Sequence, residues 1–384
     1  MTKVLFISQW YPHRYDPMFG LFVQKHAEAV ALYANVAVLY VHPDPSITKR
    51  EIEITSEKGF QEIRVYYPAA GNSITAAIRK QIEYLTAYRE GFNLLYDSWG
   101  LPDIIQASVF TRTALVAAFL KWKYKIPYAV IEHWTRYFRE KTFRNLIHRQ
   151  LSIVAAASAD AVMPVTKHLQ KCMEQHGMKN ANYHIINNVV DDLFFQKLAK
   201  PSAKKIRILN VTCFDDAQKN LSGLLNVIQA LRIKRQDFEL MLVGEGVDSY
   251  QIKELSQEKG LGDDVVLFTG MLTGEELVKT FQQSHFTVLF SNYENIPVVI
   301  SESFACGLPV ISTNVGGIAE HIDKSNGLLI EKGNEMALFE ALDYMLDHYK
   351  DYNPEQLKEM AYNKYSYSSV GKELLDIYKN IVKQ

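Results

Sequence analysis

The sequence predicts two α/β domains, each built on a doubly wound parallel sheet, with a linker between them. Three observations predict this fold. Short apolar runs alternate with longer helical patterns along the chain, which is typical of parallel sheets made of βαβ units. Residues 191–205 lose this periodicity and gain Lys, Pro and Ser, as linkers do. The length of 384 residues corresponds to two domains at about 150 residues each.

The apolar runs form two sets, one for each sheet. In the first half we expect strands at 3–8, 35–41, 62–68, 103–108, 128–133, 160–166 and 183–190. In the second half we expect strands at 206–212, 238–244, 264–270, 286–292, 308–313 and 327–330. We therefore place an N-terminal domain at 1–195 and a C-terminal domain at 196–366. Ligands bind beyond the carboxyl ends of the strands in such sheets, so residues that follow strands should line a central cleft.

The composition is that of an ordinary globular protein, with 48% apolar and 22% charged residues. Cys172, Cys213 and Cys306 lie far apart, which argues against a disulfide framework and a zinc site and fits a reducing compartment. The first apolar run is too short for a signal peptide. No run approaches the ~20 residues of a membrane span. We therefore expect a cytoplasmic protein.

The near-zero net charge hides an asymmetry between the halves. Residues 1–200 carry 24 Lys and Arg against 17 Asp and Glu, whereas residues 201–384 carry 18 against 26. The basic excess is concentrated in 111–150, where aromatic and aliphatic residues alternate with Arg136, Arg139, Lys141, Arg144 and Arg149. The pattern fits a solvated helix face, and it equally fits a patch that faces anionic lipid headgroups or an anionic acceptor. Nucleic acid is a weaker interpretation, because no recognition motif or overall basic balance accompanies the patch.

The segment "NYENIPVVISESFACGLPVISTNVGG" carries the strongest chemical signal. Glu294 stands just past an expected strand, Asn295 can cap a helix, and Pro297 suits its first turn. Such a helix N-terminus attracts phosphate. Glu302 lies further along, ~7–8 Å inside the helix at ~1.5 Å per residue. The two carboxylates are therefore too far apart to share a proton, but they could hold hydroxyl groups at the two ends of a nucleotide sugar.

At these residues the chain resembles a known family. The two Glu residues with the following "ACGLPVIST" and "VGGIAEHI" are similar to the signature of family 4 retaining glycosyltransferases of the GT-B fold, also named glycosyl transferases group 1. "YPHRYDPMFGLFV", which contains Gly20, and "VIEHW", which contains His133, resemble the family's N-terminal segments in order. "INNVVD", "LVGEG" and "VLFTGML" resemble later ones. The resemblance covers nearly the whole chain and is more specific in the C-terminal half.

The resemblance implies a role for each matching residue. Glu302 would hold the ribose hydroxyls of the donor and Glu294 the hydroxyls of the transferred sugar. Lys219 would neutralise the departing diphosphate, and His133 would touch the sugar from the N-terminal domain. Gly20 would be the glycine of the family's N-terminal donor and acceptor loop. Apart from the resemblance, Gly316 and Gly317 predict a turn, and their amides could also approach the donor. The family transfers with retention and without a metal or other cofactor, and its leaving phosphate accepts the proton of the acceptor. A last helix near 367–384 would pack back on the N-terminal domain.

The chain departs from the family pattern in two places that bear on binding. The family's Arg before the diphosphate-binding Lys falls on Cys213, so half of the usual cationic pair is missing. The family's Gly-Phe-Gly is here Asn295-Ile296-Pro297, and Pro297 has no N–H to offer a phosphate. Asn295 and Ile296 would then supply the backbone donors. Separately, the lone GxG at 244–246 predicts a sharp turn after a strand, because it lacks the third Gly of a dinucleotide fingerprint.

We expect a hexosyltransferase that uses a UDP- or GDP-linked sugar. Its acceptor would be a lipid-linked or growing glycan in bacterial surface or capsular polysaccharide assembly at the cytoplasmic membrane. Two other classes stay open: a nucleotide-sugar epimerase on the same architecture, and a non-catalytic sugar-nucleotide-binding protein, which the missing Arg would suit. A pyridoxal-phosphate phosphorylase would be larger and would need a lysine context that is not seen. The sequence leaves the donor base, the sugar, the linkage and the oligomeric state undetermined.

Overall fold

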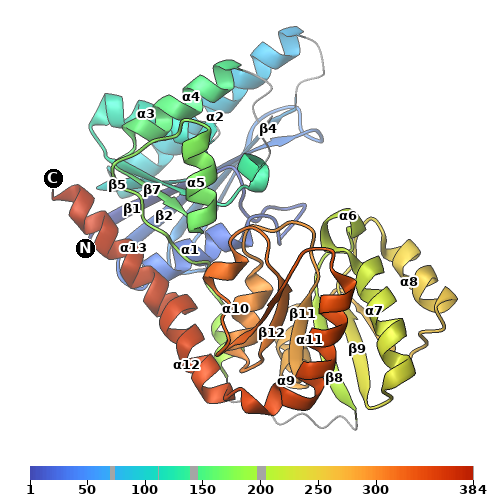
Figure 1. The fold of residues 1–384 in the computed structure, drawn as a ribbon. Helices are drawn as coiled ribbons and strands as arrows, with labels where there is room; N and C mark the ends of the chain where they lie inside the picture. The colour runs from blue at the N-terminus through green and yellow to red at the C-terminus, as the bar shows by residue number, and fades with distance from the viewer. Residues whose placement is uncertain (70–73, 111, 139–145, 197–204, 384) are drawn as a thin grey trace. The chain divides into compact units, whose positions relative to one another are not determined.

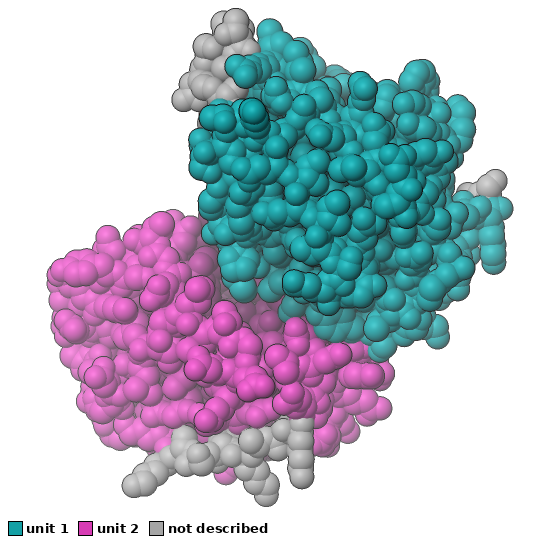
Figure 2. Space-filling model, turned by 180° about the vertical axis from the view of Figure 1, so that it is seen from behind, with its two compact units in different colours: residues 1–189, 367–384 teal, residues 190–366 magenta. Residues whose placement is uncertain are grey.

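The computed structural model describes residues 1–69, 74–110, 112–138, 146–196 and 205–383. The chain divides into two compact units (Figure 2): unit 1 comprises residues 1–189 and 367–384, and unit 2 comprises residues 190–366. Each unit has its own largely or wholly parallel sheet, so the predicted α/β fold class is confirmed. The boundary lies a few residues before the predicted 195, because Val190 and Phe194 bury their side chains in the core of unit 2.

Unit 1 is built on a seven-stranded sheet in the order β3-β4-β2-β1-β5-β6-β7. Its strands are β1 Lys3–Ser8, β2 Asn35–Asp44, β3 Glu51–Thr55, β4 Gln61–Pro68, β5 Ile104–Ser108, β6 Tyr128–Glu132 and β7 Ala161–Pro164. All pairings are parallel except that of β3 with β4. β3 was not predicted. The strand expected at 183–190 is wrong, because only a single bridge joins Tyr183 to β7 before the chain leaves the sheet.

Helices flank this sheet, and one of them comes from the C-terminus. They are α1 Leu21–Ala31, α2 Ile74–Trp99, α3 Arg112–Tyr124, α4 Leu146–Ser158, α5 Lys167–Gln175 and α13 Tyr367–Val382. A Cβ at Gly371 of α13 would lie 2.1 Å from the Ala29 carbonyl oxygen of α1, so only glycine permits this approach. The Tyr378 hydroxyl donates to Gln106 Oε1 of β5 at 2.8 Å. The last helix therefore belongs to unit 1.

Unit 2 is built on a six-stranded parallel sheet in the order β10-β9-β8-β11-β12-β13. Its strands are β8 Ile206–Val211, β9 Phe238–Val243, β10 Val266–Gly270, β11 Phe286–Leu289, β12 Val310–Thr313 and β13 Gly327–Ile330. The first strand, β8, has β9 on one side and β11 on the other. The strand order reverses between β8 and β11, which makes their carboxyl ends the switch point where doubly wound sheets bind ligands.

The helices of unit 2 cover its sheet (Figure 1). They are α6 Asp216–Lys219, α7 Leu221–Lys234, α8 Ser249–Glu258, α9 Gly274–Gln282, α10 Val298–Ala305, α11 Glu335–His348 and α12 Pro354–Tyr365. Two apolar clusters form the core, one around α7 and α11 and one around α10 and α12. β11 and β12 are buried along their whole length, so the loops that follow them are held by rigid elements.

Candidate functional site

Two loops meet at the switch point of unit 2. The chain after β8 forms the short helix α6, and the chain after β11 leads to α10. The amide of Asn292 donates to the Gln218 carbonyl at 2.7 Å, and Gln218 Nε2 donates to the Tyr293 carbonyl at 3.3 Å. These bonds fix the two loops against each other, although they lie more than seventy residues apart in the sequence.

The two loops bring Lys219 and Glu294 into a direct ion pair. Lys219 Nζ donates to Glu294 Oε1, and the two side chains are only 12% and 8% exposed. Ser291 Oγ donates to the same oxygen at 2.9 Å. The sequence predicted both residues but not their pairing. A buried pair persists when further hydrogen bonds satisfy it, and here it provides an ammonium that can turn to an incoming anion.

Helix α10 begins directly after this pair. Its N-cap is Pro297, whose side chain makes no capping bond, so the predicted capping by Asn295 is not the arrangement found. The dipole of the helix favours an anion at this N-terminus. Asn295 is buried beside it. Glu302 lies within α10 and is half-buried.

Glycines hold the Glu294 loop in place. Gly316 has a φ of +59°, and a Cβ there would lie 1.9 Å from the Glu294 carbonyl oxygen. The Gly317 amide donates to the Asn295 carbonyl at 2.9 Å, so this N–H is already used within the protein. These two glycines have a packing role, and their predicted contact with the donor stays a prediction.

The glycines at 244 and 246 form the sharp turn that the sequence predicted. A Cβ at Gly244 would lie 1.8 Å from the Thr212 carbonyl oxygen, and one at Gly246 would lie 2.4 Å from that of Phe214. The loops after β8 and β9 therefore pack closely only because these positions are glycine. Cys213, at the place of the family's Arg, lies exposed in this region.

In unit 1, a carboxylate that the sequence did not indicate organises the loop that holds His133. Glu132, fully buried, accepts bonds from the amides of Phe110, His133 and Trp134, each at 2.8 Å, and from the Tyr137 hydroxyl at 3.1 Å. Burial raises the pKa of Glu132, and these hydrogen bonds act against that shift. "VIEHW" offered no signal for this role, because a strand-end Glu is ordinarily solvated.

The surroundings of His133 keep its imidazole neutral. Its ring centroid lies 4.2 Å from that of Phe22 and 5.7 Å from that of His26. Burial, and then the neighbouring His26, hold the pKa of His133 well below its usual value. Nearby, Gly20 begins α1 with a φ of +67°, and a Cβ there would lie 2.3 Å from the Trp10 carbonyl carbon.

The carboxyl end of β5 contains a strained residue. Val109 is buried and has a φ of +71°, which is rare for a β-branched side chain. It lies where the strand order of unit 1 reverses, between β1 and β5. Strain of this kind is concentrated at functional sites, so the position supports a ligand-binding role for this edge of the sheet.

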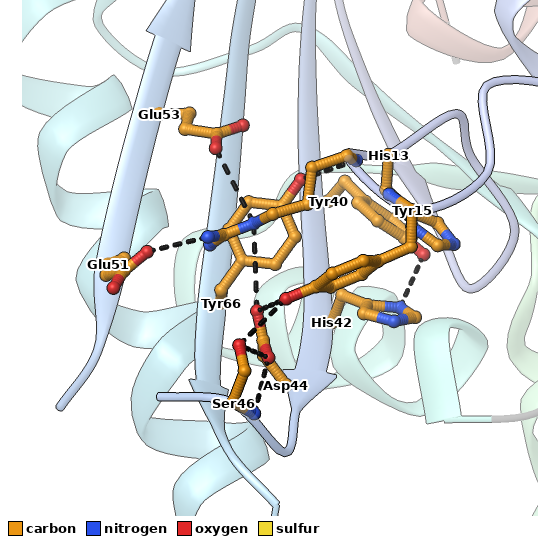
Figure 3. A network of polar contacts seen from close by, with 10 residues as sticks. His13, Tyr15, Tyr40, His42, Asp44, Ser46, Glu51, Glu53 and Tyr66 are labelled. Atoms are coloured by element: carbon orange, nitrogen blue, oxygen red, sulfur yellow. Dashed lines mark hydrogen bonds and ion pairs between the residues drawn. The ribbon is translucent and has the colours of Figure 1, made fainter. Parts of the chain in front are cut away.

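A polar network holds the loop after β1 against the sheet (Figure 3). The Arg14 guanidinium lies 3.6 Å from the centroid of the Tyr66 ring, and its Nη1 donates to Glu51 Oε2 at 2.8 Å. The Tyr15 hydroxyl donates to Asp44 Oδ2 at 2.7 Å. The loop that ends at Gly20 is therefore fixed by side chains from β2, β3 and β4, and the missed β3 contributes Glu51 and Glu53.

Two stacked histidines in this network predict a pH dependence of stability. The rings of His13 and His42 lie 4.2 Å apart, and Tyr40 bonds to His42 Nδ1 at 2.8 Å (Figure 3). Burial, followed by the charge of His13, lowers the pKa of His42 to about 4. Between that value and the unfolded pKa of about 6.5, the unfolded chain binds a proton that the folded chain does not. The neutral form of His42 therefore contributes its full stabilisation above about pH 6.5, and this contribution is lost as the pH falls towards 4.

The variant His42→Asn isolates this contribution. We expect its free energy of unfolding to fall less between about pH 7 and pH 4.5 than that of the wild type, because Asn does not titrate. Denaturant unfolding at several pH values measures the difference in slope. His348→Asn is the control, since His348 is exposed on the other unit. Equal slopes for the wild type and His42→Asn would contradict the assigned pKa shift.

The basic patch predicted from the sequence is only partly described. Arg139, Lys141 and Arg144 lie outside the described residues. The Arg136 guanidinium lies 4.3 Å from the centroid of the Trp134 ring, and the Arg149 guanidinium bonds to the His176 carbonyl at 3.4 Å. Both described members therefore contact the protein itself. The patch stays a prediction.

The described residues contain no group of three or more His, Cys, Asp or Glu placed to hold a metal ion. Within the same residues, no helix has the length and hydropathy needed to cross a bilayer.

The pair of Lys219 and Glu294 beside a helix N-terminus can bind an anion that carries hydroxyl groups. Residues 191–366 match the family model Glycosyl transferases group 1. Unit 2 is therefore similar, over nearly its whole length, to the domain that this family model describes.

Relatives of this chain are named as glycosyltransferases. An uncharacterized glycosyltransferase of Methanocaldococcus jannaschii is 28% identical over 68% of this chain and 70% of its own length. A second one from that organism matches over 42% of each chain, so the chain spans less than half of that relative. The MMP alpha-(1->4)-mannosyltransferase of Mycolicibacterium hassiacum is 22% identical over 98% of this chain and 90% of its own.

The structure is similar to solved GT-B glycosyltransferases. Sucrose-phosphate synthase from Thermosynechococcus elongatus superposes with a TM-score of 0.76 at 20% identity, covering 100% of both chains. HepE from Anabaena, solved with UDP, superposes with a TM-score of 0.73 at 14% identity, covering 99% of this chain and 100% of that one. This likeness confirms the GT-B fold class. The central cleft expected between the two domains stays a prediction.

Proposed function

We propose that the chain is a family 4 glycosyltransferase that moves a hexosyl unit from a nucleotide-diphosphate sugar to an acceptor glycan. One observation carries this proposal. The buried pair of Lys219 and Glu294 lies at the switch point of a domain similar to glycosyl transferases group 1, directly before the N-terminus of α10. A cation, a carboxylate and a helix N-terminus then meet where doubly wound sheets bind nucleotides.

When the donor binds, its diphosphate would replace Glu294 as the ion-pair partner of Lys219. Negative charge grows on the leaving diphosphate during transfer, and a positioned ammonium stabilises charge that develops in the transition state. The dipole of α10 acts in the same direction. When Lys219 turns to the diphosphate, Glu294 keeps its bond from Ser291 and gains capacity to accept bonds from sugar hydroxyls. Glu302, further along α10, would accept bonds from the ribose hydroxyls.

The finer features of the reaction follow the family resemblance. We propose transfer with retention of the anomeric configuration, without a metal ion, and with the leaving phosphate as the acceptor of the proton. The donor would be UDP- or GDP-linked. His133 and Gly20 would contact the donor from unit 1, as the resemblance implies.

Two relatives support a role in bacterial surface polysaccharide assembly. One is a 41.2 kDa protein of the cps region of Klebsiella pneumoniae, 24% identical over 68% of this chain. The other, from Campylobacter jejuni, is a 4-alpha-N-acetylgalactosaminyltransferase whose name includes diphospho-undecaprenol, and it is 26% identical over 55% of this chain. We therefore propose a lipid-linked or growing glycan as the acceptor and a cytoplasmic location.

Glu302→Ala tests the assignment of the donor site. Removing the carboxylate removes charged acceptors for two hydroxyl groups, so we expect the KM for the donor to rise roughly 10- to 100-fold. Release of nucleotide diphosphate at a series of donor concentrations measures it. Glu340→Ala is the control, because Glu340 is exposed on α11 and should keep the wild-type KM. Equal KM values for the wild type and Glu302→Ala would contradict the proposed role of Glu302.

The same purified wild-type protein distinguishes a glycosyltransferase from the other two functional classes. An epimerase would change the nucleotide sugar with no acceptor present, which an NMR spectrum of the donor would show. A non-catalytic binding protein would bind the nucleotide sugar but release no nucleotide diphosphate with any glycan acceptor.

A further inference from the structure

Unit 1 contains a large apolar cavity that the donor site does not use. Its volume is about 910 Å³, which is near the upper end of the ~300–1,000 Å³ of small-molecule pockets. It opens among α2, α3 and α4, and its apolar walls include Tyr84, Leu85, Phe92, Leu115, Phe119 and Leu151. The residues assigned to the donor lie outside these three helices. Arg149 of the predicted basic patch lies on α4.

The surface around the opening is unusually apolar. On α2, Ile78, Ile82 and Leu85 follow one another at helical spacing and are each 58–59% exposed. On α3, Phe119 is 53% exposed and Trp122 is 71% exposed. On α4 the exposed apolar residues are Leu146, Ile147, Leu151 and Val154. Leu85, Phe119 and Leu151 also line the cavity, so the apolar stripes of three helices converge at its opening. Clustered exposure of this kind marks an interaction site.

Positive charge accompanies this apolar surface. α3 and α4 contain four Lys and Arg and no Asp or Glu. Arg89, Arg112 and Lys123 line the cavity, and among the described lining residues none is acidic. The Arg112 guanidinium lies 5.2 Å from the centroid of the Tyr84 ring, which holds this charge at the cavity wall. The cavity therefore combines an apolar interior with cations that suit an anion.

We propose that this cavity and its rim bind an anionic phospholipid of a bilayer. One hydrocarbon chain would enter the cavity, the phosphate would lie among Arg89, Arg112 and Lys123, and the exposed side chains of the rim would enter the membrane interface. A single buried chain gives only weak membrane binding, and a basic patch supplies the second contribution that stable binding requires. The proposal concerns unit 1 alone and does not depend on the proposed transferase activity.

A second copy of the chain fits this face less well. Most protein dimers use a two-fold interface, in which the same patch occurs on both sides. Such an interface would bring Arg89, Arg112 and Lys123 of both copies together, and none of the described lining residues is acidic. The charge of the face therefore favours an anionic membrane surface.

Co-sedimentation of the full chain with lipid vesicles tests the proposal. We expect the wild type to sediment with vesicles of phosphatidylcholine mixed with phosphatidylglycerol and to stay in solution with phosphatidylcholine alone. The double variant Phe119→Ser/Trp122→Ser should bind the mixed vesicles about tenfold more weakly, because it removes two side chains of the rim. Both are exposed, so its thermal unfolding midpoint should stay near that of the wild type.

The matched control is Ile233→Ser/Tyr250→Ser in unit 2, where the two side chains are 87% and 72% exposed. It should bind the vesicles as the wild type does. Wild-type protein that stays in solution with both vesicle types, or equal binding by the Phe119/Trp122 variant and the control, would overturn the proposal. A wild-type dimer that the Phe119/Trp122 variant converts to a monomer would also overturn it, since a second copy would then cover this face.

A second variant tests the cavity apart from its rim. Leu115 is half-buried and lines the cavity, so Leu115→Trp places a bulky ring in the path of a hydrocarbon chain without removing the exposed rim residues. We expect this variant to bind the mixed vesicles several-fold more weakly than the wild type. Binding equal to that of the wild type would overturn the insertion of a hydrocarbon chain into the cavity.

Discussion

Lys219→Met is expected to lower kcat/KM for transfer by about 10²- to 10³-fold and to destabilise unit 2. The loss of transfer follows because the ammonium stabilises charge on the leaving diphosphate, and removal of one such group costs about this factor. The loss of stability follows because Glu294, only 8% exposed, is left without its cation. Breaking a buried ion pair in this way costs about 3–5 kcal/mol. Initial rates and denaturant unfolding measure the two effects.

The ion pair of Arg207 with Glu239 provides a matched control. It joins β8 to β9 in the same sheet with an N–O distance of 2.6 Å, and both side chains are 16% exposed. Arg207 stands at the start of β8, at the opposite end from the switch point. Arg207→Met should therefore lose stability but retain transfer. If Lys219→Met lost no more transfer than Arg207→Met, the role of Lys219 at the diphosphate would be wrong.

Glu294→Gln is expected to slow transfer strongly while leaving nucleotide binding intact. The substitution keeps the size of the side chain and an oxygen for Ser291, but it removes the charge that holds Lys219. Lys219 is then available to a diphosphate at no electrostatic cost, so UDP or GDP should bind at least as tightly as to the wild type. Transfer should fall about 10²- to 10³-fold, because the sugar loses a charged acceptor for its hydroxyl groups in the transition state.

Calorimetric titration with the nucleotide and rate measurements on the same sample separate the two effects. Glu239→Gln is the control and should change neither quantity, since Glu239 pairs with Arg207 away from the switch point. Loss of nucleotide binding in Glu294→Gln would contradict the assignment of Glu294 to the sugar and Lys219 to the diphosphate.

The alternation of apolar runs was sufficient to predict the two sheets, because parallel strands buried on both faces form continuous apolar runs. It did not predict β3, whose sequence "EIEIT" is short, alternates Glu with Ile and lies at an edge of the sheet. It wrongly predicted a strand at 183–190, where apolar residues are buried by side-chain packing and the segment forms only one bridge with the sheet.

The sequence indicated the individual residues of the candidate site but not the contacts between them. Lys219 and Glu294 each follow a strand, which the sequence indicates, but their pairing depends on β8 and β11 being neighbours in the sheet. Glu132 was missed because its role arises from the amides that meet around it after folding. The packing role of Gly316 likewise depends on how closely the Glu294 carbonyl approaches it.

Thermal unfolding with nucleotide sugars tests the central claim most directly, which is that Lys219 and Glu294 mark the binding site of a nucleotide-diphosphate sugar. A ligand present at about 100 times its dissociation constant adds about 2.7 kcal/mol of stability. Wild-type protein should be stabilised by a UDP-, GDP- or ADP-linked sugar more than by a CMP-linked one, which lacks the diphosphate, and Lys219→Met should lose this stabilisation. The account would be contradicted if none of the diphosphate sugars stabilised the wild type, or if Lys219→Met were stabilised equally.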